Sequence, residues 1–173
     1  MNPKTCAFTG HRPQNLPFGF NEEDKRCVWL KEILRSKITR LIVEERISHF
    51  ISGMAIGIDM YAAEIVLSLK KDCPGITLEG VIPCTSQADK WPEQLQKRYA
   101  DIFSKCDKTT YIQKNYTFNC MYKRNKYMVD QADIILAVWD GSRGGTANTV
   151  KYALSQNKPV QIIHPQTLLV ENL

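Results

Sequence analysis

Short apolar runs alternate along the chain with longer segments in which apolar residues recur every three or four positions. The short runs predict β-strands, because buried parallel strands are almost continuously apolar. The longer segments predict amphipathic helices, whose apolar stripe repeats about every 3.6 residues. The expected strands are 5–9, 49–52, 76–82, 109–112, 134–139 and 159–163, and the expected helices are about 21–45, 59–69, 91–103, 119–131 and 146–156.

This regular alternation of strand and helix predicts the α/β class, with right-handed crossovers between parallel strands. We expect a single Rossmann-like domain over residues 1–173, a three-layer sandwich with a mostly parallel central sheet and helices on both faces. Asn21, followed by three acidic residues, is the expected cap of the first long helix. Residues 13–20 contain two prolines and a glycine, and we interpret them as a candidate lid over the site.

The composition is typical of a globular protein, since 43% of the 173 residues are hydrophobic and 24% are charged. No apolar run approaches the roughly 18 residues that a membrane-spanning helix needs. The amino terminus also lacks the pattern of a signal peptide. We therefore expect a cytoplasmic protein with no membrane partner.

The six cysteines are scattered without a CxxC pair, and the three histidines lie far apart in the chain. Structural zinc requires ligands clustered at short spacings, so we expect no metal site. Reduced thiols, mostly buried, are the preferred interpretation.

Three glycine-bearing loops, 9–13, 52–59 and 140–146, each follow an expected strand. The carboxyl ends of parallel strands share one edge of a sheet, where ligands enter the crevice. Glycine lets backbone N–H groups approach an anion closely, and the start of the following helix favours negative charge. The three loops therefore predict a site for a nucleotide or another phosphorylated ligand.

In the first loop, His11 and Arg12 directly follow Gly10 and are expected to face the crevice. Arginine presents a rigid fork of donors to a phosphate or carboxylate. Histidine can bind the same anion or transfer a proton near neutral pH. We therefore expect both side chains to contact the ligand.

The second loop places Gly53 and Gly57 before Asp59. We expect Gly53 to allow a tight turn and Gly57 to allow close approach of the backbone at the helix start. Asp59 has two interpretations, an N-cap of the helix or a ligand contact, and the sequence leaves both open. Neither the GxGxxG fingerprint nor the GxxxxGKS phosphate loop is present.

The third loop joins an apolar strand to a helix, so its N–H groups and the hydroxyl of Thr146 can surround a phosphate. Arg124 and Asn125, on the preceding helix, are expected to project toward the same edge. Trp91, which follows the third strand, fits the apolar stripe of its helix. We interpret it as a packing residue, with base stacking as the alternative.

The formal net charge is +5, and part of the excess lies in a lysine-rich stretch at 105–126. Such a stretch can contact phosphates of a ligand or of nucleic acid, or it can form a solvated face. Because we expect no series of exposed aromatic side chains between these lysines, nucleic acid ranks below a small ligand.

Taken together, these segments resemble the YpsA/YoqJ-like family, a bacterial and phage family in the SLOG superfamily of Rossmann-like proteins. The resemblance rests on TGHRP (9–13), SGMAIGID (52–59), RNKYMVD (124–130) and ILAVWDG (135–141) running into GGT (144–146). It covers nearly the whole chain. It implies a nucleotide-derived ligand, and the family has no established reaction.

Two relatives in that superfamily suggest alternative functions. The second loop is similar to the SGxAxGID stretch of DprA, a recombination mediator that binds single-stranded DNA. The third loop is related to the PGGxGTxxE motif of the LOG phosphoribohydrolases. In this chain Gly141, Ser142 and Arg143 replace its first three residues, and Thr149 replaces the glutamate. Loss of that carboxylate argues against ribosyl hydrolysis of the LOG kind.

Three functions follow in order of preference. The first is a binding or sensor domain for a nucleotide or an ADP-ribose-like ligand, with no other cofactor implied. The second is a nucleotide-processing enzyme that cleaves an N-glycosidic or phosphate bond, with His11 or Asp59 as its acid–base residue. The third is a single-strand DNA-binding protein. The sequence leaves homo-oligomer formation open. The residues expected to contact the ligand are Thr9, Gly10, His11, Arg12, Ser52, Gly53, Gly57, Asp59, Arg124, Asp140, Gly141, Gly144, Gly145 and Thr146.

Overall fold

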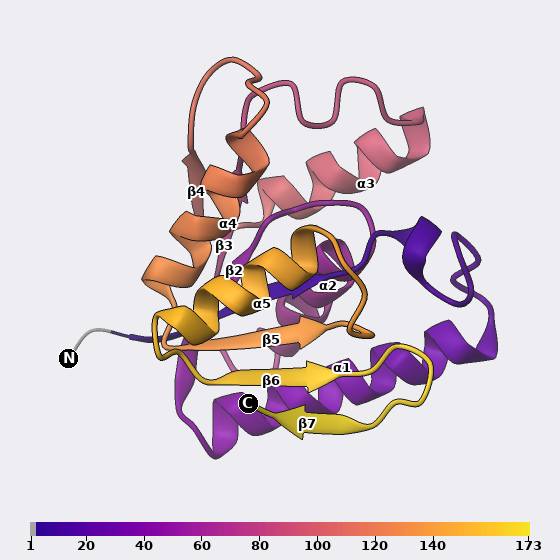
Figure 1. The fold of residues 1–173 in the computed structure, drawn as a ribbon, viewed down its shortest axis with the longest axis vertical. Coiled ribbons are helices and arrows are strands. Elements are labelled where there is room, and N and C mark those ends of the chain that lie inside the picture. Colours follow the sequence, from indigo (N-terminus) through magenta and orange to yellow (C-terminus); the bar gives the residue numbers. More distant parts are fainter. Residues whose placement is uncertain (1–2) are drawn as a thin grey trace.

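A computed structural model describes residues 3–173 and contains one seven-stranded sheet (Figure 1). The strands are β1 (Lys4–Gly10), β2 (Ile47–Ser52), β3 (Thr77–Ile82), β4 (Lys108–Tyr111), β5 (Ile134–Val138), β6 (Val160–Ile163) and β7 (Val170–Asn172). Their spatial order is β4-β3-β2-β1-β5-β6-β7. Neighbouring strands are parallel except β6 and β7, which are antiparallel.

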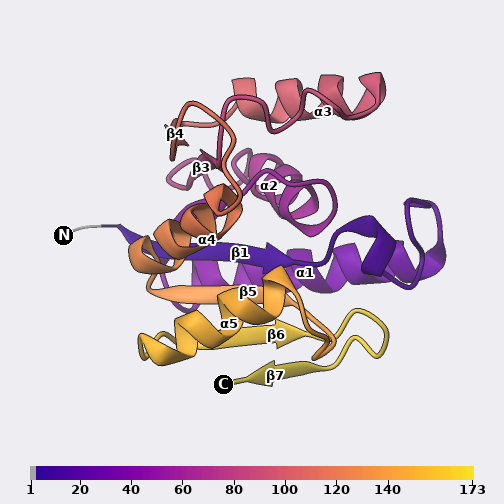
Figure 2. The same cartoon turned by 45° about the horizontal axis from the view of Figure 1, so that its top comes forward.

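Helices cover both faces of this sheet. They are α1 (Lys25–Val43), α2 (Ile58–Leu69), α3 (Glu93–Ser104), α4 (Cys120–Gln131) and α5 (Gly145–Ser155), with a short 3₁₀ helix at Pro13–Asn15. Figure 2 shows α4 and α5 on one face, whereas α2 packs against both α1 and α3 on the other. The predicted three-layer α/β fold with a mostly parallel sheet is therefore confirmed.

Two buried clusters lie on the two faces, and the alternating side chains of β1 contribute to both. Phe8 belongs to the cluster that includes α1 and α2, and its ring stacks on Phe50 with centroids 5.7 Å apart. Ala7 belongs to the opposite cluster, with Met128 of α4 and Val150 of α5. Since successive side chains of a strand point to opposite faces, β1 is the centre of both cores.

The first long helix begins later than predicted. Asp24 is its N-cap, and the carboxylate accepts a hydrogen bond from Arg26 N at 2.8 Å. Asn21, the expected cap, lies in the preceding turn, where its side chain accepts from Glu23 N at 3.1 Å. The acidic residues before α1 therefore belong to the preceding turn and not to the first turn of the helix.

Residues 13–20 do not form the lid that their prolines and glycine led us to expect. Leu16 and Phe18 are each only 6% exposed and belong to the core on the α1 face. Just beyond them, Glu22 pairs with Arg98 of α3. Opening the segment would expose both apolar side chains at a cost of roughly 3 kcal/mol or more, so it is a fixed part of the site's frame.

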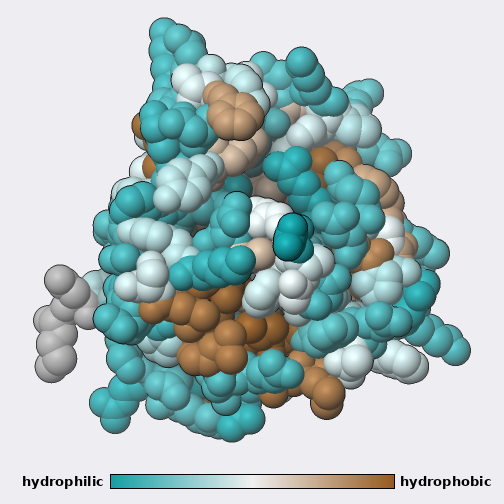
Figure 3. Space-filling view, viewed as in Figure 1, coloured by the Kyte–Doolittle hydropathy of each residue, from teal (hydrophilic) through white to brown (hydrophobic). Residues whose placement is uncertain are grey.

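Strand β7 was not predicted, because it has only three residues and one of them is apolar. It pairs with β6 at one edge of the sheet. Figure 3 shows an apolar area on this part of an otherwise mostly hydrophilic face. Leu154, Leu169 and Leu173 are the exposed large apolar residues of this end of the chain.

The six cysteines are free thiols, and four of them are buried, in agreement with the prediction. Within residues 3–173, no helix combines the length and the apolar character needed to cross a membrane.

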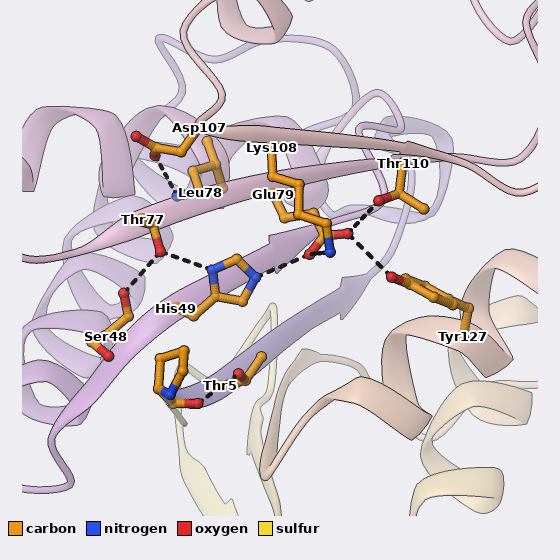
Figure 4. A network of polar contacts seen from close by, with 11 residues as sticks. Thr5, Ser48, His49, Thr77, Leu78, Glu79, Asp107, Lys108, Thr110 and Tyr127 are labelled. Atoms are coloured by element: carbon orange, nitrogen blue, oxygen red, sulfur yellow. Dashed lines mark hydrogen bonds and ion pairs between the residues drawn. The ribbon is translucent and has the colours of Figure 1, made fainter. Parts of the chain in front are cut away.

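A buried carboxylate links three strands to α4 (Figure 4). Glu79 of β3 is 1% exposed. It accepts four hydrogen bonds, from His49 Nε2 (3.0 Å), Lys108 Nζ (3.1 Å), Thr110 Oγ1 (2.6 Å) and Tyr127 Oη (3.3 Å). Burial by itself raises the pKa of Glu79, but the donors from His49, Thr110 and Lys108 outweigh it and lower the pKa to about 2. The ionised side chain thus joins β2, β3 and β4 to α4.

Replacing Glu79 by glutamine should lower the stability of the protein and make it less sensitive to acid. Because the folded-state pKa lies below the ordinary value of 4.5, the ionised network stabilises the fold above that pH, and this contribution disappears as the pH falls toward 2. We expect Glu79→Gln to reduce the free energy of unfolding at neutral pH by roughly 2–3 kcal/mol.

Urea denaturation at a series of pH values measures both effects. Glu23→Gln is the matched control, because Glu23 is exposed and its carboxylate makes no hydrogen bond or ion pair within the described residues. Its stability should follow that of the wild type at every pH. A Glu79→Gln protein whose stability also followed the wild type would contradict this account of the network.

Candidate functional site

The three glycine loops meet at one hollow on the carboxyl edge of the sheet. Figure 1 shows that the carboxyl ends of β5 and β6, marked by their arrowheads, lie on the same side as the end of β1 and the start of α5. The hollow contains about 750 Å³, part of it open to solvent. The predicted residues that line it are Thr9, Gly10, His11, Arg12, Asp59, Arg124, Gly144, Gly145 and Thr146.

The other predicted residues, Ser52, Gly53, Gly57, Asp140 and Gly141, lie outside the lining. The Ser52 hydroxyl is buried and donates to the backbone oxygen of Asp59 at 2.8 Å. Gly57 has φ +100°, and a Cβ there would lie 2.8 Å from the backbone oxygen of His11. The absence of a side chain at Gly57 therefore lets the second loop approach the backbone of the first loop closely. These residues shape the loops and do not face the hollow.

Asp59 is not the N-cap of α2, which was one of its two interpretations. Gly57 occupies the cap position and provides no side chain. The Asp59 carboxylate lies within the first turn and accepts a weak hydrogen bond from Ala55 N at 3.4 Å. Its side chain is buried at the base of the hollow. Burial raises the pKa of Asp59, and the positive charge of Arg124 opposes this rise.

A buried arginine forms the base of the hollow. Arg124 is 5% exposed. Its Nη1 donates to the backbone oxygen of Gly53 and lies 3.9 Å from Asp59 Oδ2, while its Nε donates to Asn125 Oδ1 at 2.7 Å. Burial lowers the pKa of Arg124, and Asp59 opposes this. Its Nη2 makes no hydrogen bond with the described part of the chain, which leaves this donor available to a ligand in the hollow.

Gly53 provides space for Arg124, whereas we expected it to allow a tight turn. A Cβ at Gly53 would overlap the Arg124 guanidinium and would lie 2.7 Å from Asp59 Oδ2. The left-handed residue of the turn is the following one, Met54, with φ 56°. The hydrogen side chain of Gly53 therefore provides the space in which the guanidinium group lies.

An imidazole–carboxylate pair connects the first and third loops. His11 Nε2 lies 2.8 Å from Asp140 Oδ1, which also accepts from Ser142 N at 2.9 Å. Burial raises the pKa of Asp140, but the hydrogen bonds from Ser142 and His11 hold it well below its ordinary value. Since an ionised carboxylate only accepts, Nε2 of His11 carries a hydrogen. The pair fixes the orientation of the imidazole beside the hollow.

The start of α5 presents free backbone donors to the hollow. Gly144 is its N-cap, with φ 147°, and no side chain caps the first turn. Gly145, Thr146 and Ala147 form that turn and all line the hollow. The first N–H groups of a helix have no partner within the helix, and the helix dipole favours an anion there. This arrangement suits a phosphate oxygen.

Asn125, which was expected to project toward this edge, lines the hollow, and the lining residues that were not expected are Phe8, Asn15, Ala55, Met121, Ser142, Arg143 and Ala147. Arg143 is the most consequential, because it adds a third guanidinium to those of Arg12 and Arg124. Its place in the third loop was a sufficient signal for including it. Trp91 packs edge-on against Tyr99, with ring centroids 5.5 Å apart, which agrees with its interpretation as a packing residue.

The lysine-rich stretch carries more exposed aromatic residues than we expected. Phe118 is 98% exposed, and Tyr116 and Tyr122 are each more than half exposed. Lys114 and Lys123 are exposed between and beside them. The expectation of no exposed aromatic series in this stretch was therefore wrong, because no other element within residues 3–173 covers these rings of α4 and of the segment before it.

Fold and site together define an α/β protein with an arginine-lined hollow at the carboxyl ends of its parallel strands. The chain belongs to the YpsA family, described as the "YspA SLOG family", whose model matches residues 6–168. It is 32% identical over 150 residues to a UPF0398 protein of Brevibacillus brevis, covering 83% of this chain and 76% of that protein. It is 26% identical over 172 residues to a UPF0398 protein of Bacillus thuringiensis, covering 98% and 92%.

Solved structures with the same fold include two DprA proteins. The Helicobacter pylori protein, described by its single-stranded DNA binding mode, superposes with a TM-score of 0.64 at 16% identity and matches 92% of this chain. The Streptococcus pneumoniae protein gives a TM-score of 0.61 at 16% identity and matches 94%. This chain spans 65% of the first DprA chain and 50% of the second. The likeness at this identity concerns the fold.

Replacing Gly53 by alanine should displace Arg124 and destabilise the protein. The new methyl group would overlap the buried guanidinium and would separate it from its two oxygen partners. We expect a loss of roughly 1–3 kcal/mol, which corresponds to a melting temperature lower by about 3–10 °C. Differential scanning calorimetry measures the shift.

Gly145→Ala is the matched control, because a Cβ there meets no other atom within 4 Å. Its melting temperature should stay close to that of the wild type. If Gly53→Ala melted at the wild-type temperature as well, Arg124 would not depend on the space at Gly53.

Proposed function

We propose that this protein is a cytoplasmic, single-domain binding protein for a nucleotide or nucleotide-derived ligand of the ADP-ribose type. The observation that carries the proposal is the convergence of three arginines and an uncapped helix start on one hollow. Arg12 and Arg143 are exposed at its rim, and Arg124 is buried at its base. Arginine and helix N-termini both favour phosphate.

No single group supplies enough binding energy. A helix N-terminus contributes about 0.3–1 kcal/mol toward an anion, and up to about 2 when partly buried. Micromolar affinity requires about 8 kcal/mol. The arginines and the backbone donors of α5 must therefore act together, and this favours a ligand with one or two phosphate groups over a simple carboxylate.

Binding is favoured over catalysis by the positions of the acidic residues. In the LOG motif the position of Thr149 carries a glutamate, whereas here Thr149 is buried and donates its hydroxyl hydrogen to the backbone oxygen of Gly145 at 2.9 Å. Asp59 lies beside Arg124, and Asp140 is engaged by His11. The nucleotide-processing alternative would have to use His11 or Asp59 in these paired states.

Replacing Arg12 by alanine should weaken binding of ADP-ribose about tenfold without unfolding the protein. Arg12 is exposed at the rim of the hollow, so its removal takes away a charge and leaves the core intact. A hydrogen bond to a charged group is worth roughly 1.5–3 kcal/mol, which is at least a tenfold change in affinity. Isothermal titration calorimetry measures the dissociation constant.

Arg40→Ala is the control, since Arg40 is an exposed arginine near the carboxyl end of α1 that pairs with Glu44. It should bind ADP-ribose like the wild type. Equal affinities for Arg12→Ala and Arg40→Ala would count against the proposed site. Chromatography of the same mixtures after several hours shows whether base or ribose phosphate is released, which would establish the enzymatic alternative.

Single-stranded nucleic acid is a second candidate partner, and the exposed aromatic residues near Lys114 and Lys123 favour it. Basic grooves that carry exposed rings bind single strands by stacking and by phosphate contacts. The DprA relative of known fold is described as binding single-stranded DNA. Phe118 is 98% exposed and lies in the chain between the exposed residues Lys114 and Lys123, so this stretch carries both kinds of group.

Phe118→Ala should weaken binding of an oligothymidine about tenfold if this surface stacks on bases, since one stacked base is worth about 1–3 kcal/mol. Trp29→Ala is the control, because Trp29 is an aromatic residue of α1 that is 56% exposed. Fluorescence anisotropy measures both affinities, which should fall steeply with added salt. Absence of binding by the wild type at about 0.1 mM would remove this candidate, since nonspecific binders bind more tightly than that.

A further inference from the structure

A second hollow adjoins the arginine-lined one and lies between α4 and α5. It contains about 410 Å³, part of it open to solvent. Met121, Asn125 and Gly145 line both hollows, so the two are adjacent. We call this second hollow the α4–α5 groove.

The walls of the groove differ in character from those of the arginine-lined hollow. Met121 and Tyr122 contribute apolar and aromatic surface from α4, and Tyr152 contributes a ring from α5. Within the described part of the chain, the only cationic residue in the lining of the groove is Lys126, which is paired with Asp130, whereas three arginines line the first hollow. The groove therefore suits an aromatic part of a ligand and not its phosphate.

Two amides supply hydrogen-bonding groups along the groove. Asn125 uses its Oδ1 for Arg124, and its amide nitrogen makes no hydrogen bond within residues 3–173. Asn148 is exposed, and its side chain has no hydrogen-bond partner there either. A carboxamide both donates and accepts, which matches the mixed donor and acceptor edge of a nucleobase. Both amides face the same groove.

The spacing along α5 fits the distance from a phosphate to a base. Gly145 starts the helix at the arginine-lined hollow, and Asn148 lies about 4.5 Å further along the axis at 1.5 Å per residue. Tyr152 lies about 10 Å from Gly145 on the same scale. Its hydroxyl donates to Asp130 Oδ1 at 2.7 Å, and Lys126 pairs with Asp130 at 3.0 Å. Lys126 and Tyr152 of this cluster line the groove.

We propose that the α4–α5 groove is the nucleobase subsite of the ligand, with Tyr122 stacking on the base and Asn148 contacting its polar edge. The inference rests on the proposed function, because it requires a phosphate at the start of α5. The ligand is then a nucleotide whose phosphate lies among the arginines and whose base lies between the two helices. Ribose spans Gly145, where the two hollows join.

The test compares ribose 5-phosphate with AMP, GMP, CMP and UMP by isothermal titration calorimetry. Ribose 5-phosphate probes the arginine-lined hollow alone, and the difference between it and the tightest-binding nucleotide measures the contribution of the base. We expect at least a tenfold tighter binding of that nucleotide by the wild type. Tyr122→Ala should remove most of this difference in affinity, and Asn148→Ala should remove a smaller part of it. Both variants should bind ribose 5-phosphate as the wild type does.

Trp29→Ala is the control, since Trp29 is an exposed aromatic residue of α1 that does not line the groove. It should retain the full preference for the nucleotide. If ribose 5-phosphate and every nucleotide bound equally well to the wild type, the base would not occupy the groove and the inference would be overturned, with the proposed phosphate site intact. If none of the five compounds bound, the proposed function itself would fail.

Discussion

The burial of one arginine is the constraint on which the site depends. Arg124 reaches from α4 to the loop after β2 and to the first turn of α2, where it meets Gly53 and Asp59. Taking a guanidinium out of water costs several kcal/mol, which the partners of Arg124 at Gly53, Asp59 and Asn125 offset. The positions of the helix, the loop and the carboxylate are therefore tied to one another.

The same arginine connects the two functional hollows. Its Nε holds the amide of Asn125, which lines both of them, while its remaining Nη2 donor is available to the first. The His11–Asp140 pair fixes the opposite wall, because it joins the first and third loops. A ligand that spans the hollows would thus contact walls that are already held in position, which reduces the entropy cost of binding.

The fold followed from the sequence because its apolar pattern is regular and because ends of parallel strands share an edge. The same rule predicted that Arg12 and Gly145 lie at one site. The role of Gly53 did not follow, since its partner Arg124 lies 71 residues away in the chain. No local pattern reports such a contact. The prediction missed the short strand β7 and the acidic turn before α1 for a different reason, because each is defined by only a few residues.

A crystal structure of the protein with ADP-ribose tests the central claim most directly. The account predicts phosphate oxygens within about 3.2 Å of the N–H groups that start α5 and of at least one guanidinium among those of Arg12, Arg124 and Arg143. It would be contradicted by a complex in which the phosphates contact another surface while the arginine-lined hollow contains only water.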